Sequence, residues 1–265
     1  MISAFNKPYS IEKPLISIIT VVFNNSKFVR GALESVLSGN HVEIEYIVID
    51  GGSTDGTINI VQEYKHKISK FISEPDNGIY DAMNKGVKVS NGEYIAFINS
   101  DDYYKSGVLN NVISSILIDK PDLLYGNLDY INNNGDIKRH WVAGGYHKVR
   151  TRSLWIPPHP TIFMKKTIFE EVGGFNLNYS LASDYDLILK SLLASNKVNY
   201  LNEVIVKMRL GGVTNISWIN ILKQNLEIIN SYKICYGKYP IYGFFSKITD
   251  RLIQVIRAKF INKTE

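Results

Sequence analysis

Residues 93–102 read Glu-Tyr-Ile-Ala-Phe-Ile-Asn-Ser-Asp-Asp, an apolar strand from Glu93 to Ile98 that runs directly into two adjacent carboxylates. Because an apolar strand is buried, charges just beyond it are expected at the C-terminal edge of the sheet, where open α/β sheets bind ligands. Asp101 and Asp102 repel each other unless a cation lies between them, and Mg²⁺ or Mn²⁺ with a phosphate suits such oxygen ligands. Taken alone, the stretch equally allows Asp101 to cap a helix starting near Ser106, or the pair to mark a solvated turn.

The segments before this strand alternate between strand and helix patterns. Residues 16–23, Ile-Ser-Ile-Ile-Thr-Val-Val-Phe, form a nearly continuous β-branched run, which is typical of a strand buried on both faces. Further strands are expected at 44–50 and 70–73, and helices at about 27–37, 57–65 and 79–89. This βα succession predicts an α/β fold with a mainly parallel, doubly wound, Rossmann-like sheet flanked by helices.

A polar loop follows each strand, and all four loops are expected at the same sheet edge. They are Asn24-Asn25, Asp50–Asp55, Glu74–Gly78 and Asn99–Asp102. The chain has no G-x-G-x-x-G after the first strand and no G-x-x-x-x-G-K-[ST], which disfavours dinucleotide and P-loop sites. A metal held by Asp101 and Asp102 would then neutralise a diphosphate. Asp50 can accept a base N–H or cap the following helix.

Composition narrows the class of protein further. The 265 residues, 45% of them hydrophobic, suffice for one large domain or one domain with an appendage. A single cysteine, Cys235, excludes an intramolecular disulfide and a cysteine-based zinc site, which favours a reducing compartment. Residues 1–14 do not resemble a secretory signal and no stretch approaches 18 uncharged apolar residues, so we expect a cytoplasmic protein without membrane spans.

The net charge of +5 is concentrated at the end of the chain. Residues 216–265 carry eight Lys and Arg against three Asp and Glu, so the remainder is balanced and no nucleic-acid partner is expected. We expect residues 1–215 to form the main domain and 216–265 a basic, amphipathic helical extension. For 216–236 packing on the domain is favoured. For 241–263 two interpretations stay open, namely packing on the domain or on a second subunit of a homodimer, and peripheral attachment to the inner face of an anionic cytoplasmic membrane.

Five segments together resemble the family 2 glycosyltransferases, which are inverting, use nucleotide-sugar donors and have the GT-A fold. The segments are Ser17–Asn24 (SIITVVFN), Ile49–Thr57 (IDGGSTDGT), Ser73–Gly86 (SEPDNGIYDAMNKG), Asn91–Asp102 (NGEYIAFINSDD) and Ala182–Leu187 (ASDYDL). The resemblance covers about residues 15–210. The most similar subgroup makes bacterial surface polysaccharides by adding single sugars to saccharide or lipid-linked acceptors.

This resemblance implies a role for residues of the first three loops in donor binding. Asp50 resembles the aspartate that pairs with the uracil edge of UDP, and Phe23 and Asn24 lie where the first loop lines the nucleoside. The residues expected to help close over base and ribose are Asp76, Asp81 and Lys85.

The stretch Asn99–Asp102 resembles the family's D-x-D metal motif, with Asn99 at its first acidic position. Asp102 is therefore the expected direct ligand of Mn²⁺ or Mg²⁺. Asp101 is expected to contact the ribose, the donor sugar or the metal shell.

The catalytic base is expected at the start of a later helix. Inversion by single displacement needs a carboxylate to take the proton of the attacking hydroxyl. The family carries it on a Glu-Asp pair, which here reads Ser183-Asp184, so Asp184 is the predicted base and Asp186 the second candidate. An N-cap role at this helix start is compatible with catalysis. Weaker candidates for acceptor or diphosphate contacts are Trp155, His159 and Arg209.

The sequence therefore predicts a metal-dependent, inverting transferase that moves a single sugar from a UDP-sugar to a saccharide or lipid-linked acceptor in surface polysaccharide biosynthesis. Without Q-x-x-R-W the processive synthase branch is not favoured. Two alternatives stay open. A sugar nucleotidyltransferase would need a glycine-rich, basic first loop where this chain has Phe23-Asn24-Asn25-Ser26. A non-catalytic nucleotide- or saccharide-binding scaffold is compatible with Asn99 and Ser183.

Overall fold

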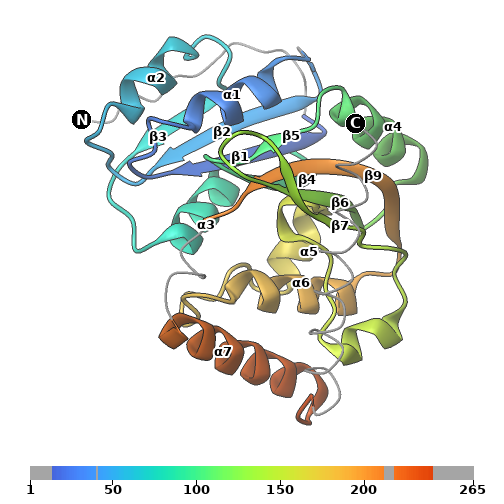
Figure 1. Cartoon of the computed structure of the whole chain (residues 1–265). Helices are drawn as coiled ribbons and strands as arrows, with labels where there is room; N and C mark the ends of the chain where they lie inside the picture. The colour runs from blue at the N-terminus through green and yellow to red at the C-terminus, as the bar shows by residue number, and fades with distance from the viewer. Residues whose placement is uncertain (1–13, 40, 212–217, 241–265) are drawn as a thin grey trace.

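The computed structural model describes residues 14–39, 41–211 and 218–240, which form a nine-stranded sheet with helices on both faces (Figure 1). The strands follow the order β3-β2-β1-β4-β8-β6-β9-β5, and β7 pairs with β6. The predicted α/β fold is therefore confirmed.

The first half of the chain builds the parallel part of the sheet. Its elements are β1 (Ile16–Val22), α1 (Val29–Leu37), β2 (Ile44–Asp50), α2 (Thr57–Glu63), β3 (Lys70–Ser73), α3 (Ile79–Val89) and β4 (Tyr94–Asn99). β1 pairs in parallel with both β2 and β4, and β2 pairs in parallel with β3. All elements predicted here are present, because their apolar runs are long and regular.

The second half makes the sheet mixed. Its elements are β5 (Tyr103–Tyr104), α4 (Val108–Asp119), β6 (Leu123–Ile131), β7 (Ile137–Trp141), η1 (Lys148–Ser153), η2 (His159–Thr161), β8 (Phe163–Lys165), α5 (Lys166–Glu171), α6 (Ser183–Ala194), β9 (Val198–Arg209) and α7 (Trp218–Tyr236). β8 is antiparallel to β4 and β6, whereas β9 is parallel to β6. β7 returns antiparallel along β6 as a hairpin, which needs no helical crossover. The pairing is thus parallel among β1 to β4, and beyond them it is antiparallel except between β6 and β9.

The central strands are buried on both faces. Along β1, Ile16 and Ile18 pack in the cluster that includes residues of α1, α2 and α4, whereas Ile19 and Val21 pack in the cluster of α3, α5 and α6. This alternation follows from the two-residue period of a strand. With both faces covered, the ends of the strands are the part of the sheet that can receive a ligand.

Helix α7 packs against α6 on the outside of the molecule (Figure 1). Its Ile228 and Tyr232 are buried against Ala182, Tyr185 and Leu189. The packing favoured for residues 216–236 is confirmed for α7. None of the described helices is long and apolar enough to cross a membrane. The two interpretations of 241–263 concern residues outside those described, and the division at 215/216 stays a prediction.

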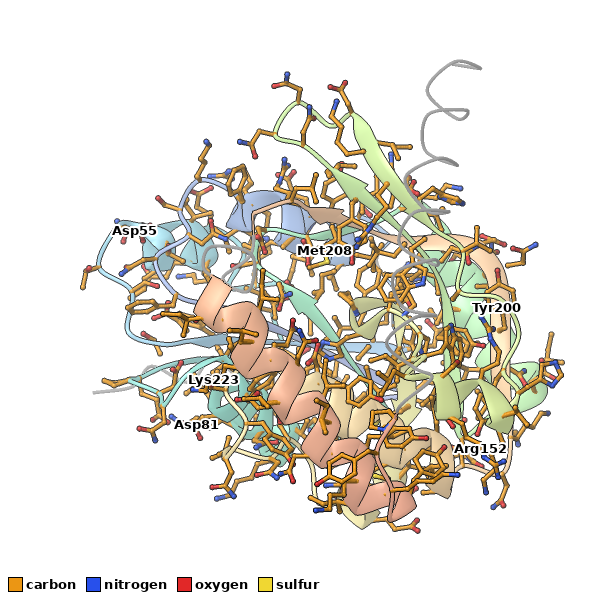
Figure 2. All side chains as sticks on the ribbon, turned by 60° about the horizontal axis from the view of Figure 1, so that its bottom comes forward. Asp55, Asp81, Arg152, Tyr200, Met208 and Lys223 are labelled. Atoms are coloured by element: carbon orange, nitrogen blue, oxygen red, sulfur yellow. The ribbon has the colours of Figure 1, made fainter. Side chains whose placement is uncertain are left out.

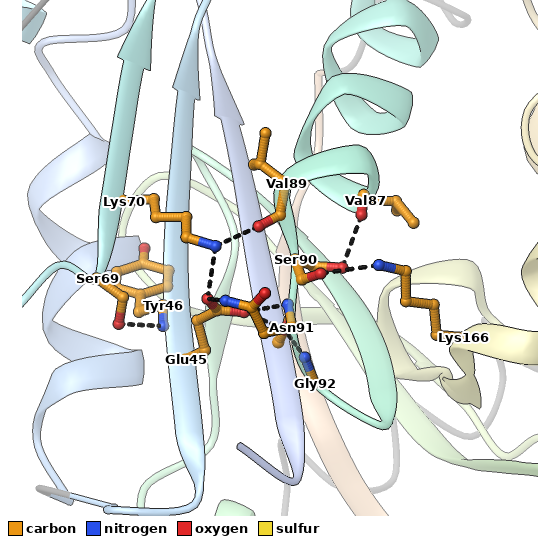
Figure 3. Close-up of polar contacts among 11 residues, drawn as sticks. Glu45, Tyr46, Ser69, Lys70, Val87, Val89, Ser90, Asn91, Gly92 and Lys166 are labelled. Atoms are coloured by element: carbon orange, nitrogen blue, oxygen red, sulfur yellow. Dashed lines mark hydrogen bonds and ion pairs between the residues drawn. The ribbon is translucent and has the colours of Figure 1, made fainter. Parts of the chain in front are cut away.

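A buried carboxylate, Glu45, links residues at the N-terminal edge of the sheet, which is the edge opposite the candidate ligand site (Figure 3). It accepts hydrogen bonds from Ser17 Oγ at 2.5 Å and from the Asn91 backbone and side chain at 2.7 and 2.8 Å. Lys70 Nζ lies 3.0 Å from Glu45 Oε1 and also donates to the Val89 carbonyl. Burial alone would raise the pKa of Glu45, but these donors outweigh it and the pKa lies below its ordinary value. Glu45 therefore stabilises the fold as an ion.

We expect Glu45→Ala to lower the free energy of unfolding by about 2–4 kcal/mol, because several donors lose a charged acceptor. A depressed pKa stabilises the fold above the ordinary value of 4.5, and this contribution is lost as the pH falls through the native pKa. The difference between wild type and variant should thus shrink in acid. Urea unfolding at several pH values measures it.

The matched control is Glu63→Ala, which removes an exposed ion pair with Arg30. Its effect should stay within about 0.5 kcal/mol. Equal losses in the two variants would contradict a structural role for the Glu45 network.

Candidate active site

The loops that follow β1, β2 and β4 are joined by hydrogen bonds at the C-terminal edge of the sheet. The Asn24 backbone donates to Ser53 Oγ at 2.8 Å, and Asn24 Oδ1 accepts from the Thr54 backbone at 2.8 Å. Asn25 Nδ2 donates to Ser100 Oγ at 2.8 Å. The predicted convergence of these loops is confirmed. Asn24 has a φ of 47°, and its side-chain oxygen joins the loop after β1 to the loop after β2.

Asp50 is fully buried at the end of β2, and its two carboxylate oxygens differ in their hydrogen bonds. Oδ2 accepts from the backbones of Gly52 at 3.1 Å and Ser53 at 3.0 Å and from Ser73 Oγ at 2.7 Å. Oδ1 is buried without a hydrogen-bond partner within the described ranges. Asp50 does not cap α2, whose N-cap is Gly56. It therefore holds its own loop with one oxygen and offers the other as an acceptor.

An exposed aromatic ring and a second carboxylate meet beside Asp50. Phe23 is 63% exposed. A Cβ built on Gly51 would lie 2.5 Å from Asp76 Oδ2 and 3.4 Å from the Phe23 ring, so the three residues adjoin and any side chain at 51 would displace the Asp76 carboxylate. A flat apolar ring next to two carboxylates, one of them with an oxygen that lacks a partner in the described ranges, is suited to a nucleobase.

Lys85 and Asp81 are occupied in shaping the loop after β3. Lys85 Nζ lies 3.2 Å from Glu74 and 3.5 Å from Asp81, and it donates to the Pro75 carbonyl at 3.0 Å. Asp81 accepts from the Asn77 backbone at 2.9 Å. Both side chains hold the segment that carries Asp76, and their contacts to base and ribose stay a prediction.

Asp102 lies at the end of β4 and is only 1% exposed. Its Oδ1 accepts from the Arg209 backbone at 3.0 Å and its Oδ2 from Asn99 Nδ2 at 3.3 Å. Burial, and then the charge of Asp101, raise the pKa of Asp102 to about 8. Burial also raises the pKa of Asp101. The cap alternative is wrong, because α4 begins after Gly107 and no side chain caps it.

The surroundings of Asp102 fit a cation that brings its own phosphate ligands. Across residues 14–39, 41–211 and 218–240, no three His, Cys, Asp or Glu side chains come together as a metal site. Asn99 Oδ1 is buried and lacks a partner among the same residues. Mg²⁺ and Mn²⁺ sites built on one or two carboxylates plus substrate phosphates have this composition.

Arg209, at the end of β9, lies beside this pair of aspartates. Its guanidinium is 4.5 Å from the Phe28 ring centroid and 5.8 Å from that of Tyr103. β9 thus contributes both a backbone donor and a positive charge to the carboxylates that follow β4.

Asp184 lies in the first turn of α6, in an environment unlike that of Asp186. Its Oδ1 accepts from Tyr80 Oη at 3.2 Å and from the Tyr185 backbone at 2.9 Å. Asp186 is fully buried, 2.6 Å from Lys190 Nζ, and accepts from Ser231 Oγ at 2.7 Å. Of the two base candidates, only Asp184 keeps an oxygen outside such a buried network.

Tyr80 and His159 complete the surroundings of Asp184. Tyr80 stacks on Phe175 at 5.3 Å, and His159 lies 5.7 Å from Phe175 and 5.8 Å from Phe97 of β4. Burial lowers the pKa of His159, although the charge of Asp184 opposes this, so the imidazole is neutral. Tyr80 was missed by sequence reasoning, although it lies within SEPDNGIYDAMNKG.

Trp155 lies in the core at 9% exposure. The Arg150 guanidinium is 4.0 Å from its ring centroid, and Tyr125 packs edge-on at 6.0 Å. This geometry gives Trp155 a packing role and offers no support for the predicted acceptor or diphosphate contact.

The chain is similar in sequence and in fold to known proteins. A family model described as glycosyl transferase family 2 matches residues 17–173. The chain is 29% identical to chondroitin synthase from Escherichia coli over 226 residues, covering 82% of this chain and 32% of that protein. It spans about a third of the length of two of the curated relatives it matches, 36% and 32%.

Two solved structures share the fold. S. aureus TarS 1–349 in complex with UDP has a TM-score of 0.64 at 20% identity, over 83% of this chain and 65% of that one. The mannosyltransferase PcManGT from Pyrobaculum calidifontis, in complex with GDP-Man and Mn²⁺, has a TM-score of 0.64 at 14% identity, over 96% and 76%. The expected GT-A fold is confirmed.

The raised pKa of Asp102 predicts an unusual pH dependence. In EDTA, the fold favours neutral Asp102, so native stability falls as the pH rises from the ordinary value of 3.8 towards about 8. Asp102→Asn carries no such penalty. With about 1.4 kcal/mol per pH unit, the variant should be more stable than wild type by on the order of 2–4 kcal/mol at pH 7. Thermal unfolding from pH 4 to pH 8.5 measures the difference.

Asp119→Asn, at an exposed carboxylate, is the control and should change little at any pH. A Tm difference for Asp102→Asn that is equal at pH 4 and pH 8.5 would contradict the raised pKa.

Proposed function

The chain belongs to glycosyl transferase family 2, and from this premise we propose that it transfers a single sugar from a UDP-sugar to a saccharide or lipid-linked acceptor. The observation that carries the proposal is the unpartnered Oδ1 of buried Asp50 beside exposed Phe23. An ionised carboxylate accepts hydrogen bonds and cannot donate them. It therefore suits a base whose facing ring nitrogen carries a hydrogen, as the imide of uracil does. The UDP complex of TarS, a protein of the same fold, is in keeping with this choice.

The diphosphate is assigned to the Asp102 end of the site. Asp102, with Asp101 and Asn99 beside it, would hold Mn²⁺ or Mg²⁺, and Arg209 would meet the leaving diphosphate. The metal would supply charge neutralisation for the two phosphates. Binding it would also allow Asp102 to ionise at neutral pH, since a cation offsets both burial and the charge of Asp101. The Mn²⁺ complex of PcManGT supports this assignment.

Transfer is assigned to the group around Asp184. Asp184 takes the proton of the acceptor hydroxyl as its oxygen bonds to the anomeric carbon and the bond from that carbon to the diphosphate oxygen breaks. Attack from the side opposite the leaving group inverts the configuration. Tyr80 donates to Asp184 and orients it, and neutral His159 lines the same place without adding a positive charge.

The cellular setting follows from the family subgroup and is part of the same proposal. A lipid-linked acceptor in surface polysaccharide synthesis would place the enzyme at the cytoplasmic face of the membrane. Residues 1–215 would act as the transferase and 216–265 as its extension.

A comparison of UDP with CDP, which differ in the nucleobase, tests the role of Asp50. Wild type should bind UDP more tightly than CDP by calorimetry with Mn²⁺, because cytosine N3 carries no hydrogen. Asp50→Asn should weaken UDP binding by about 10- to 100-fold, since its amide donor faces the imide N–H. It should also erase the preference over CDP, whose N3 can accept from that amide.

Asp55→Asn is the matched control in the same loop, because Asp55 bonds to Ser26 and Thr57. Its UDP affinity should stay within about threefold. Unchanged UDP binding by Asp50→Asn would contradict the assignment of Asp50 to the nucleobase.

Turnover tests the role of Asp184. A screen of UDP-, GDP- and dTDP-sugars for nucleotide release identifies the donor. With that donor, Asp184→Asn should lower kcat by about 10²- to 10⁴-fold while UDP binds normally. Asp186→Asn, assayed below its Tm, should keep most of the activity.

The reverse order of activities would transfer the role to Asp186. Tight UDP binding without turnover of any donor, with and without candidate acceptors, would instead identify a non-catalytic scaffold.

A further inference from the structure

The loop that precedes Asp184 is held by a carboxylate from helix α7. Glu227 is 8% exposed. Its Oε1 accepts from the Ser180 backbone at 3.1 Å and from Ser180 Oγ at 3.2 Å. Its Oε2 accepts from the backbones of Leu181 at 2.9 Å and Ala182 at 2.8 Å. All of these bonds cross between segments about 45 residues apart in sequence.

Three successive backbone N–H groups that point at one carboxylate form an anion-binding nest. Here the nest lies directly before α6, whose N-cap, Ala182, has no side chain that could accept a hydrogen bond. A negative charge at a helix N-terminus is also favoured by the helix dipole. Glu227 accepts from the N-cap amide of Ala182, as the glutamate of a capping box does, but it does so from a distant helix.

The rest of α7 supports the same loop. Gln224 Nε2, one turn before Glu227, donates to the Leu181 carbonyl at 3.2 Å. Ile228 and Tyr232 pack against Ala182 and Tyr185, the residues on either side of Ser183-Asp184. Figure 2 shows α7 in front of the molecule, with Lys223 towards its N-terminal end and Arg152 beside its C-terminal end.

We propose that Glu227 is a positioning residue for transfer: by binding the amides of residues 180–182 it holds the start of α6 so that Asp184 meets the acceptor hydroxyl. This inference rests on the proposed function of Asp184. Tyr80 of α3 also donates a hydrogen bond to Asp184. Burial, then the charge of Asp184 and more weakly that of Glu227, raise the pKa of Tyr80, which therefore keeps the proton it donates.

The proposal separates turnover from nucleotide binding. Asp50, Phe23 and Asp102 lie on the loops after β1, β2 and β4, and Glu227 contacts none of them. In Glu227→Gln one carboxylate oxygen becomes an amide donor that faces the amides of the nest. We therefore expect kcat for hydrolysis of the accepted donor to fall by about 10- to 100-fold, in line with misplacement of a catalytic group. The Kd for UDP with Mn²⁺ should change by less than about twofold, as for a distant site.

Two further variants separate positioning from mere stability. Ser231→Ala, one turn further along α7, loses a buried bond to Asp186 and should lower Tm without lowering kcat. Glu227→Asp keeps the charge on a shorter side chain and should fall between wild type and Glu227→Gln. All assays are run below the Tm of each variant.

Amide hydrogen exchange gives a measurement that does not depend on activity. Peptides covering residues 180–186 should exchange faster in Glu227→Gln than in Ser231→Ala at equal loss of Tm. Unchanged exchange there, or a kcat that follows Tm equally in both variants, would overturn the proposal. Faster exchange in a protein that turns over no donor would instead show that the loop is held as described while the proposed transferase activity fails.

Discussion

The parallel register of β1 with its two neighbours is the constraint on which the site depends. Val22 of β1 lies opposite Asp50 of β2, and Val21 lies opposite Asn99 of β4. The two loops that carry Asp50 and Asp102 therefore leave the sheet at the same level, on either side of the loop that carries Phe23. A shift of one residue would turn the apolar side chains of β1 to the opposite faces, and burial on both sides prevents it. Packing of the core thus sets the spacing between the candidate nucleobase site at Asp50 and the candidate metal site at Asp102.

Buried carboxylates in this protein fall into two kinds. Glu45, Asp186 and Glu227 are satisfied by several donors or an ion pair, and they join segments far apart in the sequence. Asp50 keeps one oxygen without a donor in the described part of the chain, and Asp102 has a strongly raised pKa. Burying an unsatisfied acceptor or a poorly compensated charge costs free energy that a bound ligand can return. The number of hydrogen-bond donors and ion pairs at each carboxylate thus distinguishes those proposed to bind ligand from those that stabilise the fold.

Sequence patterns predicted the first half well because its strands are long, apolar and buried. They did not predict that β8 pairs antiparallel with β4 and β6, because a run of three residues carries no sign of the direction in which it pairs. Among site residues, Asp50 and Asp102 lie at or just after the end of a recognisable strand, and Asp184 lies at the start of a recognisable helix. Tyr80 and Glu227 carry no comparable signal, since a tyrosine in a first helical turn and a glutamate within a helix are ordinary residues. Trp155 shows the opposite error, because the stretch Leu154–Pro157 gives no indication of the Arg150 and Tyr125 side chains that pack against its ring.

The sequence by itself determined the α/β class, the order of the first strands, the acid-rich loops at one edge and the resemblance to family 2 glycosyltransferases. These properties depend on the local period of apolar residues and on short contiguous motifs. Only the tertiary structure decided which oxygen of Asp50 has no partner in the described ranges, and that Asp101 caps no helix. It also decided that Asp186 is paired with Lys190 and Ser231. Finally, it placed Glu227 against the loop before Asp184. Contacts between residues distant in the chain contribute to these outcomes, as from Ser73 to Asp50, from Ser231 to Asp186 and from Ala182 to Glu227. The free energy of a buried charge depends on such contacts, which the neighbouring sequence does not show.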